Sequence, residues 1–295
     1  MSMNPIGIIS MFYARPFEKS HFSCFARARD AGMKFVELLV PEPGELDPVE
    51  TKAALKDAGL DVVFAARVNL QRDLASPDEA ARKAGLEYLL GCVETAKAFG
   101  AKIVGGPLYG APLVFAGRAP ALVDTTARER RIGWVVDGLA KAARRASDNG
   151  IVFGLEPLNR FETDIANTTE HALALVDAVG SPALGAMLDT FHMNMEDRDI
   201  AAAIRKAGTR MVHFQANENH RGFVGDGHID WPAVARAIVA IGYDGPITLE
   251  PFRRDDVPPG ICVAQWRVPH RNEDAELAAS RAFLEAALDS ARRAA

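Results

Sequence analysis

The chain has 295 residues, of which 48% are hydrophobic and 25% are charged, and its formal net charge is −5. These values are ordinary for a soluble globular protein, and the negative charge gives no electrostatic reason to expect nucleic acid or an anionic membrane as a partner. The cysteines Cys24, Cys92 and Cys262 are far apart and show no metal-binding or redox spacing, so we expect reduced thiols and a cytoplasmic protein.

The N-terminal segment MSMNPIGIISMFYARPF contains a short apolar run without a basic leader or a small-residue cleavage site. A secretory signal peptide needs both features, so we interpret the run as a first strand. No apolar stretch of the sequence is long enough to span a bilayer, and we expect no membrane partner.

Short apolar runs then alternate with longer amphipathic segments along the chain. The segment 76–100 predicts a helix with Ser76 as its N-cap and Gly100 as its stop, and 167–180 predicts a helix capped by Thr168 or Thr169 and ended by Gly180. The predicted strands are 6–10, 35–40, 61–66, 102–106, 151–156, 184–189, 211–215 and 246–250.

The alternation of apolar strands with helices favours an α/β fold with a parallel sheet covered by helices. Eight strand–helix units are the number that closes a (β/α)8 TIM barrel. No linker interrupts the series, so residues 1–295 are predicted to form a single catalytic domain. A doubly wound sheet is the rival fold. No Gly-x-Gly-x-x-Gly follows the first strand, GGPLYG (105–110) has the wrong spacing for a dinucleotide loop, and there is no P-loop.

Carboxylates stand at the C-terminal tips of three predicted strands, at Glu156, Asp189 and Glu250. Active sites of such barrels lie at this end. Each acid taken alone is also compatible with a solvated loop or a helix N-cap. Three close carboxylates would repel one another, and a divalent cation would remove that conflict.

The segment VHFQANENHRG (212–222) adds polar side chains to the end of the seventh strand. His213 and Gln215 share one face of that strand because successive side chains alternate between faces. A buried polar pair is costly unless each member has a partner. We therefore expect partners for both side chains inside the barrel.

Several longer motifs resemble the D-tagatose/D-psicose (D-allulose) 3-epimerase family of ketose 3-epimerases, within the xylose-isomerase-like TIM barrels. They occur in the family's order, and the similarity runs from about residue 5 to the final helix. The motifs are GLEPLNRFE (154–162), MLDTFHMN (187–194), ENHRG (218–222), GDGHIDW (225–231), LEPF (249–252), QWR (265–267) and SRAFLEAAL (280–288).

The resemblance implies a metal-dependent enzyme that inverts C3 of a free ketohexose or ketopentose of the D-psicose/D-fructose, D-tagatose or L-ribulose type. It implies Mn²⁺ or Mg²⁺, with Co²⁺ as a further option, and a homodimer or homotetramer. Two carboxylates would move protons through an enediolate, which the cation stabilises. The alternatives are an aldose–ketose isomerase of the hydroxypyruvate- or xylose-isomerase type and a non-catalytic sugar-binding protein.

The resemblance also implies roles for single residues. Glu156 and Glu250 would be both acid/base groups and metal ligands, with Asp189 as a further metal ligand. The residues placed against the sugar hydroxyls would be Glu162, His192 and Arg221.

Structural explanations compete with some of these roles. NRFE (159–162) is compatible with a surface turn containing a local ion pair, and His192 with a cap of the next helix. His213 is compatible with a hydrogen bond to a supporting carboxylate. Three aromatic residues either line the mouth of the pocket or pack in the core, namely Phe12, Tyr13 and Tyr109.

Gln215 departs from the family pattern, which has a histidine there as the fourth metal ligand. The amide oxygen of glutamine can bind a hard cation, so the site should favour Mg²⁺ or Mn²⁺ over metals that prefer imidazole. The other possibility is that Gln215 has left the metal and that His213 or a water replaces it.

Overall fold

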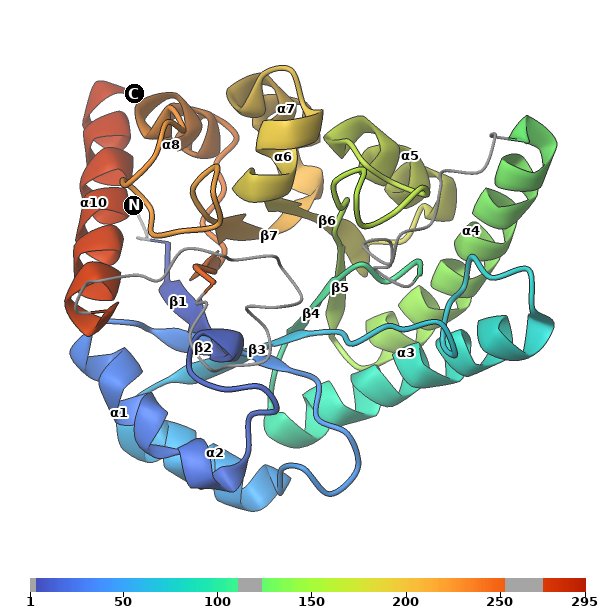
Figure 1. Cartoon of the computed structure of the whole chain (residues 1–295), viewed down its shortest axis with the longest axis horizontal. Helices are drawn as coiled ribbons and strands as arrows, with labels where there is room; N and C mark the ends of the chain where they lie inside the picture. The colour runs from blue at the N-terminus through green and yellow to red at the C-terminus, as the bar shows by residue number, and fades with distance from the viewer. Residues whose placement is uncertain (1–3, 111–123, 253–272) are drawn as a thin grey trace.

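A computed structural model describes residues 4–110, 124–252 and 273–295 (Figure 1). Its strands are all parallel, pair in chain order, and close into a barrel because β8 also pairs with β1. The predicted (β/α)8 barrel and its strand positions are therefore confirmed. Cys262 and residues 265–267 lie outside the described residues. The strands are β1 Ile6–Ile9, β2 Phe35–Leu39, β3 Asp61–Ala65, β4 Ile103–Gly106, β5 Val152–Leu155, β6 Leu184–Asp189, β7 Met211–Ala216 and β8 Ile247–Leu249.

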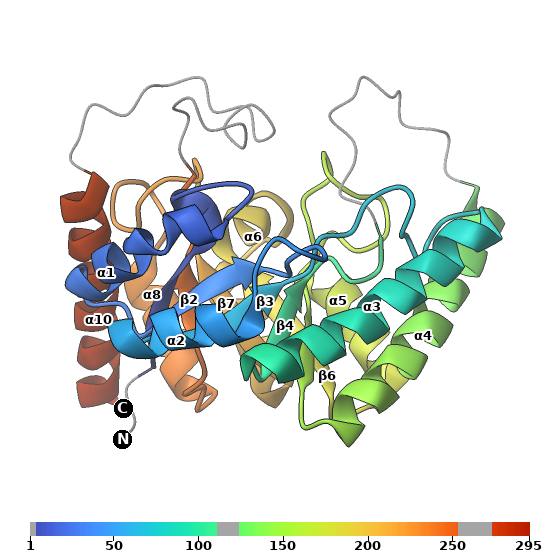
Figure 2. The same ribbon diagram turned by 90° about the horizontal axis from the view of Figure 1, so that it is seen from below.

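Helices surround the barrel on its outside (Figures 1 and 2). None of the helices described is long and apolar enough to cross a membrane. The α-helices are α1 Ser23–Asp30, α2 Pro48–Ala58, α3 Glu79–Phe99, α4 Thr125–Asp148, α5 Thr169–Val179, α6 Thr190–Glu196, α7 Ile200–Ala207, α8 Trp231–Ala240 and α10 Glu273–Ala294, and three short 3₁₀ turns lie at Ser10–Phe12, Lys19–His21 and Gly208–Arg210.

The helix ends follow the predicted signals with one correction. Gly100 and Gly180 end α3 and α5 in the left-handed conformation, and Thr168 caps α5 through its side chain. The N-cap of α3, however, is Asp78 and not Ser76. The hydroxyl of Ser76 instead accepts the amide of Asp78 at 3.1 Å, which forms a turn before the helix.

The interior of the barrel is kept open for polar side chains by small residues. A Cβ added at Gly105 on β4 would lie 2.3 Å from the sulfur of Met187 and 3.5 Å from the ring of His213. Glycine at this position therefore leaves room for Met187 on β6 and for the inward-facing imidazole on β7. Gln215 lies on the same face of β7, two residues nearer the C-terminal end of the strand.

Candidate active site

Acidic side chains converge at the C-terminal end of the barrel. Glu156 follows β5, Asp189 ends β6 and Glu250 follows β8, and their exposed fractions are 5%, 0% and 4%. Asp189 is aligned with Gln215 in the pairing of β6 with β7. The acids that the sequence predicts at the strand tips are thus buried, which excludes the solvated-loop alternative for all three.

Arg221 lies among these acids. Its Nη1 donates to Asp189 Oδ2 at 2.9 Å, and its Nη2 donates to Glu250 Oε2 at 3.0 Å. The guanidinium also lies between the rings of Phe191 and Phe252, at 4.6 and 4.4 Å from their centroids. The expectation that the carboxylates lack a compensating charge without metal is therefore wrong, because Arg221 neutralises part of their charge.

Asp189 has two structural tasks at once. Its Oδ1 accepts the amide of Phe191 at 2.7 Å, which makes it the N-cap of α6, and the same atom accepts Asn217 Nδ2 at 3.1 Å. The N-cap interpretation of Asp189 is thus correct, and its other carboxylate oxygen still faces the candidate active site.

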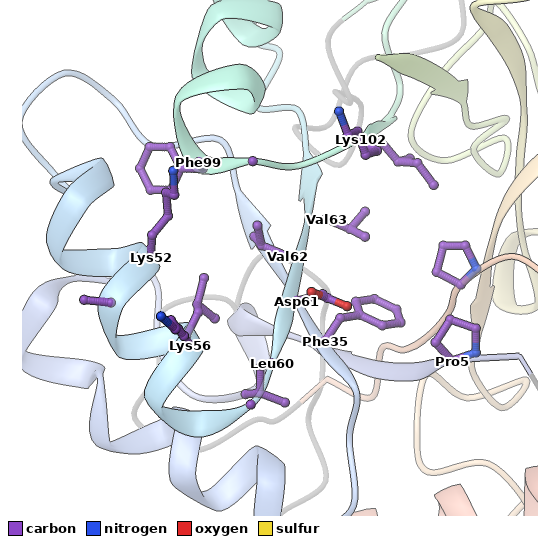
Figure 3. A pocket seen from close by; sticks show the side chains of 16 residues that line it. Pro5, Phe35, Lys52, Lys56, Leu60, Asp61, Val62, Val63, Phe99 and Lys102 are labelled. Atoms are coloured by element: carbon purple, nitrogen blue, oxygen red, sulfur yellow. The ribbon is translucent and has the colours of Figure 1, made fainter. Parts of the chain in front are cut away.

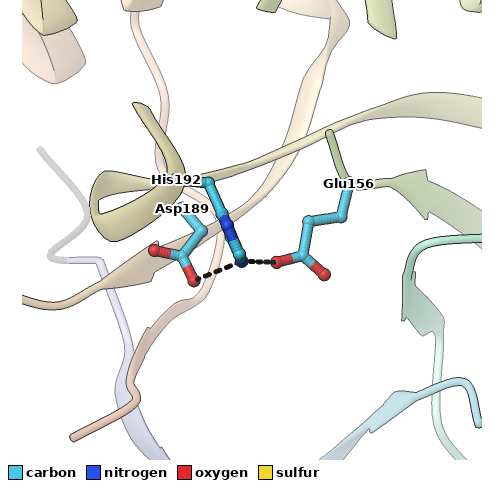
Figure 4. Close-up of side chains that lie close together, drawn as sticks. All are labelled: Glu156, Asp189 and His192. Carbon is cyan, nitrogen blue, oxygen red and sulfur yellow. Dashed lines mark ion pairs between the residues drawn. The ribbon is translucent and has the colours of Figure 1, made fainter. Parts of the chain in front are cut away.

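His192 lies in the first turn of α6 and faces the acids (Figure 4). Its Nδ1 accepts the backbone amide of Asn159 at 3.0 Å, so in the neutral ring Nε2 carries the proton. Nε2 lies 3.2 Å from Arg221 Nη1, 3.5 Å from Glu156 Oε1 and 3.9 Å from Asp189 Oδ2. Burial lowers the pKa of His192, although Asp189 opposes this effect. Burial thus favours the neutral ring, and the helix-cap alternative is wrong because Asp189 is the cap.

The loop after β5 carries Glu162. Its Oε1 accepts Asn159 Nδ2 at 3.0 Å, so it connects through Asn159 to His192. The neighbouring Arg160 is exposed and pairs with Glu196 at 2.9 Å. The predicted local ion pair within NRFE is therefore wrong.

Gln215 is held by a residue that the sequence analysis missed. Its Nε2 donates to Oε1 of Glu37 at 3.0 Å, while its own Oε1 is buried with no hydrogen-bond partner among the described residues. His213 Nε2 lies 2.8 Å from Glu37 Oε2, so the hypothesis that His213 bonds a supporting carboxylate is confirmed. A lone acid inside the apolar strand Phe35–Leu39 was the available signal.

The pKa values of the acids diverge. Burial raises the pKa of Glu156 well above its usual value, and Asp189 and Glu250 raise it further. Burial also raises the pKa of Glu250 well above its usual value, although Arg221 opposes this. Burial alone would raise the pKa of Asp189, but Arg221, His192 and the amide of Phe191 together lower it. Burial thus favours the protonated form of Glu156 and Glu250, whereas the neighbours of Asp189 favour its ionised form.

A carboxylate fixes the loop that carries Arg221. Glu218 is fully buried and accepts Trp231 Nε1 at 2.6 Å and the amide of Gly225 at 2.9 Å. A Cβ at Gly227 would lie 2.2 Å from its carboxylate oxygen. Arg221 itself has a φ of 61°, in the left-handed region. The motifs ENHRG and GDGHIDW therefore build one anchored loop.

The aromatic residues near the strand ends pack in the core. Tyr109 is fully buried, and its hydroxyl lies 3.3 Å from both the amide of Leu158 and the carbonyl of Ala166. Phe12 is also fully buried and packs edge-on against Tyr13, with centroids 5.0 Å apart. The core interpretation is correct for Phe12 and Tyr109.

A cavity of about 790 Å³ lies at the opposite end of the barrel (Figure 3). Its wall includes Asp61 and Lys102 beside the first residues of β3 and β4, and none of the candidate site residues. The side chains of Lys52, Lys56 and Lys102 point in different directions, so their charges do not converge on one point. This cavity is separate from the candidate active site.

Comparison with known proteins identifies the family. A family model described as xylose isomerase-like TIM barrel matches residues 25–292. The L-ribulose 3-epimerase of Mesorhizobium japonicum is 32% identical over 296 residues, which cover 99% of this chain and 96% of the relative. The chain belongs to the ketose 3-epimerase family. The ketose 3-epimerase of Arthrobacter globiformis is 33% identical, with 82% of this chain and 81% of that epimerase covered.

Solved structures agree with this family of epimerases. The structure of an L-ribulose 3-epimerase has a TM-score of 0.90 and 31% identity, and the match covers 99% of this chain and 96% of the other. A D-allulose 3-epimerase of Methylomonas sp. in complex with D-allulose has a TM-score of 0.87 and 28% identity, covering 97% and 98%. The chain is a sugar epimerase.

The buried cluster of this ketose 3-epimerase fits a cation. One ligand atom each from Glu156, Asp189 and His192 lie within 4.8 Å of one another. His192 is the poorer ligand of the three because its Nδ1 already accepts the amide of Asn159 and its Nε2 lies 3.2 Å from the guanidinium of Arg221. Gln215 offers a buried amide oxygen that no described residue bonds. Carboxylate and amide oxygens together are a donor set for a hard divalent cation.

Proposed function

We propose that this epimerase inverts C3 of a free ketohexose or ketopentose, with a divalent metal held by Glu156, Asp189, Gln215 and Glu250. The observation that carries the proposal is the pair of buried carboxyl groups, Glu156 and Glu250, whose pKa values are both raised at the active end of the barrel. Relatives named for L-ribulose and D-psicose support the ketose as the substrate class.

Inversion at C3 needs a base on one face of the sugar and an acid on the other. One of the two glutamates, ionised, removes the C3 proton. The C–H electron pair forms a C2–C3 double bond, and the C2 oxygen takes the negative charge. The other glutamate, protonated, returns a proton to C3 on the opposite face, and the double bond collapses to restore the ketone. The two residues exchange roles in the reverse reaction.

The remaining side chains bind and orient the sugar. A bound divalent cation would supply positive charge that stabilises the enediolate oxygens. His192 donates a hydrogen bond from Nε2 to a substrate oxygen, and its backbone partner Asn159 fixes that tautomer. Arg221 and Glu162 bind hydroxyl groups, and the stacking of Phe191 and Phe252 on the guanidinium limits its orientation.

Exchange of the C3 proton in heavy water tests the proposal. We expect Mn²⁺-dependent incorporation of deuterium at C3 for at least one member of a panel of ketohexoses and ketopentoses, measured by NMR. Product analysis is the control, because epimerisation keeps the ketone at C2 whereas an aldose–ketose isomerase moves it to C1. Full activity without metal, or no exchange at C3 with any ketose, would contradict the proposal.

Substitutions of Gln215 test its place as a ligand. We expect Gln215→Ala to weaken Mn²⁺ binding by roughly 10-fold or more, as loss of groups around a metal often does. Gln215→His should keep the site and shift its preference from Mg²⁺ toward Co²⁺ or Zn²⁺, because imidazole is a better ligand for these ions. Titration calorimetry with each metal measures both effects.

His213→Ala is the comparison for these variants. If Gln215 has left the metal and His213 replaces it, Gln215→Ala will bind Mn²⁺ as tightly as the wild type and His213→Ala will lose affinity. That result would remove Gln215 from the ligand set.

The oligomeric state and the location of the protein remain predictions. We expect a homo-oligomer, which light scattering would measure, and a cytoplasmic location.

A further inference from the structure

Glu37 is a buried carboxylate on β2 that receives side chains from β7 and β8, two strands that do not pair with β2. It is fully buried, and its Oε1 accepts Gln215 Nε2 at 3.0 Å. Its Oε2 accepts the hydroxyl of Thr248 and lies 2.8 Å from Nε2 of His213. A hydroxyl, an amide NH₂ and an imidazole N–H can all donate, so the carboxylate of Glu37 can accept in all three contacts.

This contact decides which end of the Gln215 amide faces the site. A carboxamide has a donor end and an acceptor end, and it can turn by 180° to exchange them. The reversed amide would place its oxygen against the Glu37 carboxylate, with two acceptors facing each other. The orientation in the structure satisfies Glu37 and leaves Gln215 Oε1 buried without a hydrogen-bond partner among the described residues. A buried carbonyl oxygen in that state is costly unless something else binds it.

We propose that Glu37 is a positioning residue that holds Gln215 in the one amide orientation able to ligate the cation. The inference rests on the proposed metal site. Glutamine needs such a partner because its two ends are nearly equal in size, and only the hydrogen bonds around it distinguish oxygen from nitrogen.

Variants at position 37 separate this role from a simple effect of charge. In Glu37→Gln, the new NH₂ group can donate to Gln215 Oε1 and withdraw it from the cation. Glu37→Asp keeps the charge but is one methylene shorter, so it also loses the contact with the amide. We expect both variants to bind Mn²⁺ about 10-fold more weakly than the wild type in titration calorimetry, a loss typical of supporting groups at metal sites.

A double-mutant cycle supplies the decisive comparison. Without an amide at position 215 there is nothing to orient, so Glu37→Gln should change the Mn²⁺ affinity of Gln215→Ala by less than about twofold. Asp197→Asn is the matched control. It removes a partly buried carboxylate that accepts the Thr169 hydroxyl at 2.7 Å outside the site, and its Mn²⁺ affinity should stay at the wild-type value.

The outcomes are distinct. Wild-type affinity in Glu37→Gln, or an undiminished loss in the Gln215→Ala background, would overturn the positioning role alone. Wild-type affinity in Glu37→Asp would also overturn the positioning role, because the charge of the carboxylate would then explain the loss in Glu37→Gln. Glu37→Asp also keeps the test possible if Glu37→Gln does not fold. A wild-type protein that binds no Mn²⁺ would overturn the proposed metal site itself.

Discussion

Glu156→Gln and Glu250→Gln should each lower turnover by at least about 100-fold, the range typical for loss of a positioned proton carrier. Glutamine keeps the shape of the side chain and its ability to accept a hydrogen bond, but it can neither remove nor return a proton at C3. Both residues are buried, and both have pKa values raised by that burial, so no exposed acid can replace them. Turnover is measured as the initial rate of ketose interconversion at saturating Mn²⁺.

Two measurements make this result specific. Mn²⁺ titration of each variant shows whether the cation is still bound, because both residues are also proposed ligands. Glu94→Gln, which changes an exposed carboxylate paired with Arg145 on the outside of the barrel, is the control and should keep full turnover. Near-full epimerisation by either active-site variant with metal bound would remove that residue from the mechanism.

Removal of the metal should lower the melting temperature, and added Mn²⁺ should restore it. A ligand that binds only the native state stabilises it by mass action, by about 2.7 kcal/mol at a free concentration of 100 Kd. For a chain of this size that corresponds to a shift of roughly 4 °C. Arg221 already neutralises part of the charge on Asp189 and Glu250, so the metal-free protein should remain folded.

Differential scanning calorimetry after EDTA treatment and gel filtration measures this effect. EDTA saturated with Mn²⁺ before use is the control for nonspecific effects of the chelator. An unchanged melting temperature, in protein shown by elemental analysis to be metal-free, would count against a shared metal site. Full reversal by Mn²⁺ is part of the expected result.

The sequence predicts the fold well because strand patterning is local. Each strand was marked by a short apolar run, and each acid at a strand tip was placed by the rule that parallel strands end at the same edge. The alternation along β7 also placed His213 and Gln215 on one face correctly. Such predictions need only the periodicity of a strand and the closure of the barrel.

The parts that escaped prediction depend on contacts between distant segments. Glu37 and His213 are 176 positions apart in the chain, and they meet inside the barrel only because its closure between β8 and β1 brings β7 near β2. The pairing of Arg221 with Asp189 and Glu250 depends on a loop whose shape is set by buried Glu218. The N-cap of α3 was missed for a local reason, since Ser76 and Asp78 are both good caps.

The left-handed backbone of Arg221 has a consequence for directed evolution. A non-glycine residue in that conformation costs roughly 1–2 kcal/mol, and the site retains arginine there with a φ of 61°. Glycine at this position would relieve that cost, but it would leave the buried carboxylates of Asp189 and Glu250 without their cationic partner, which costs about 3–5 kcal/mol. A library at this position should therefore enrich arginine under selection for thermal stability as well as under selection for ketose turnover. The two selections would act on this codon in the same direction, because the loss of the buried charge outweighs the gain in backbone freedom.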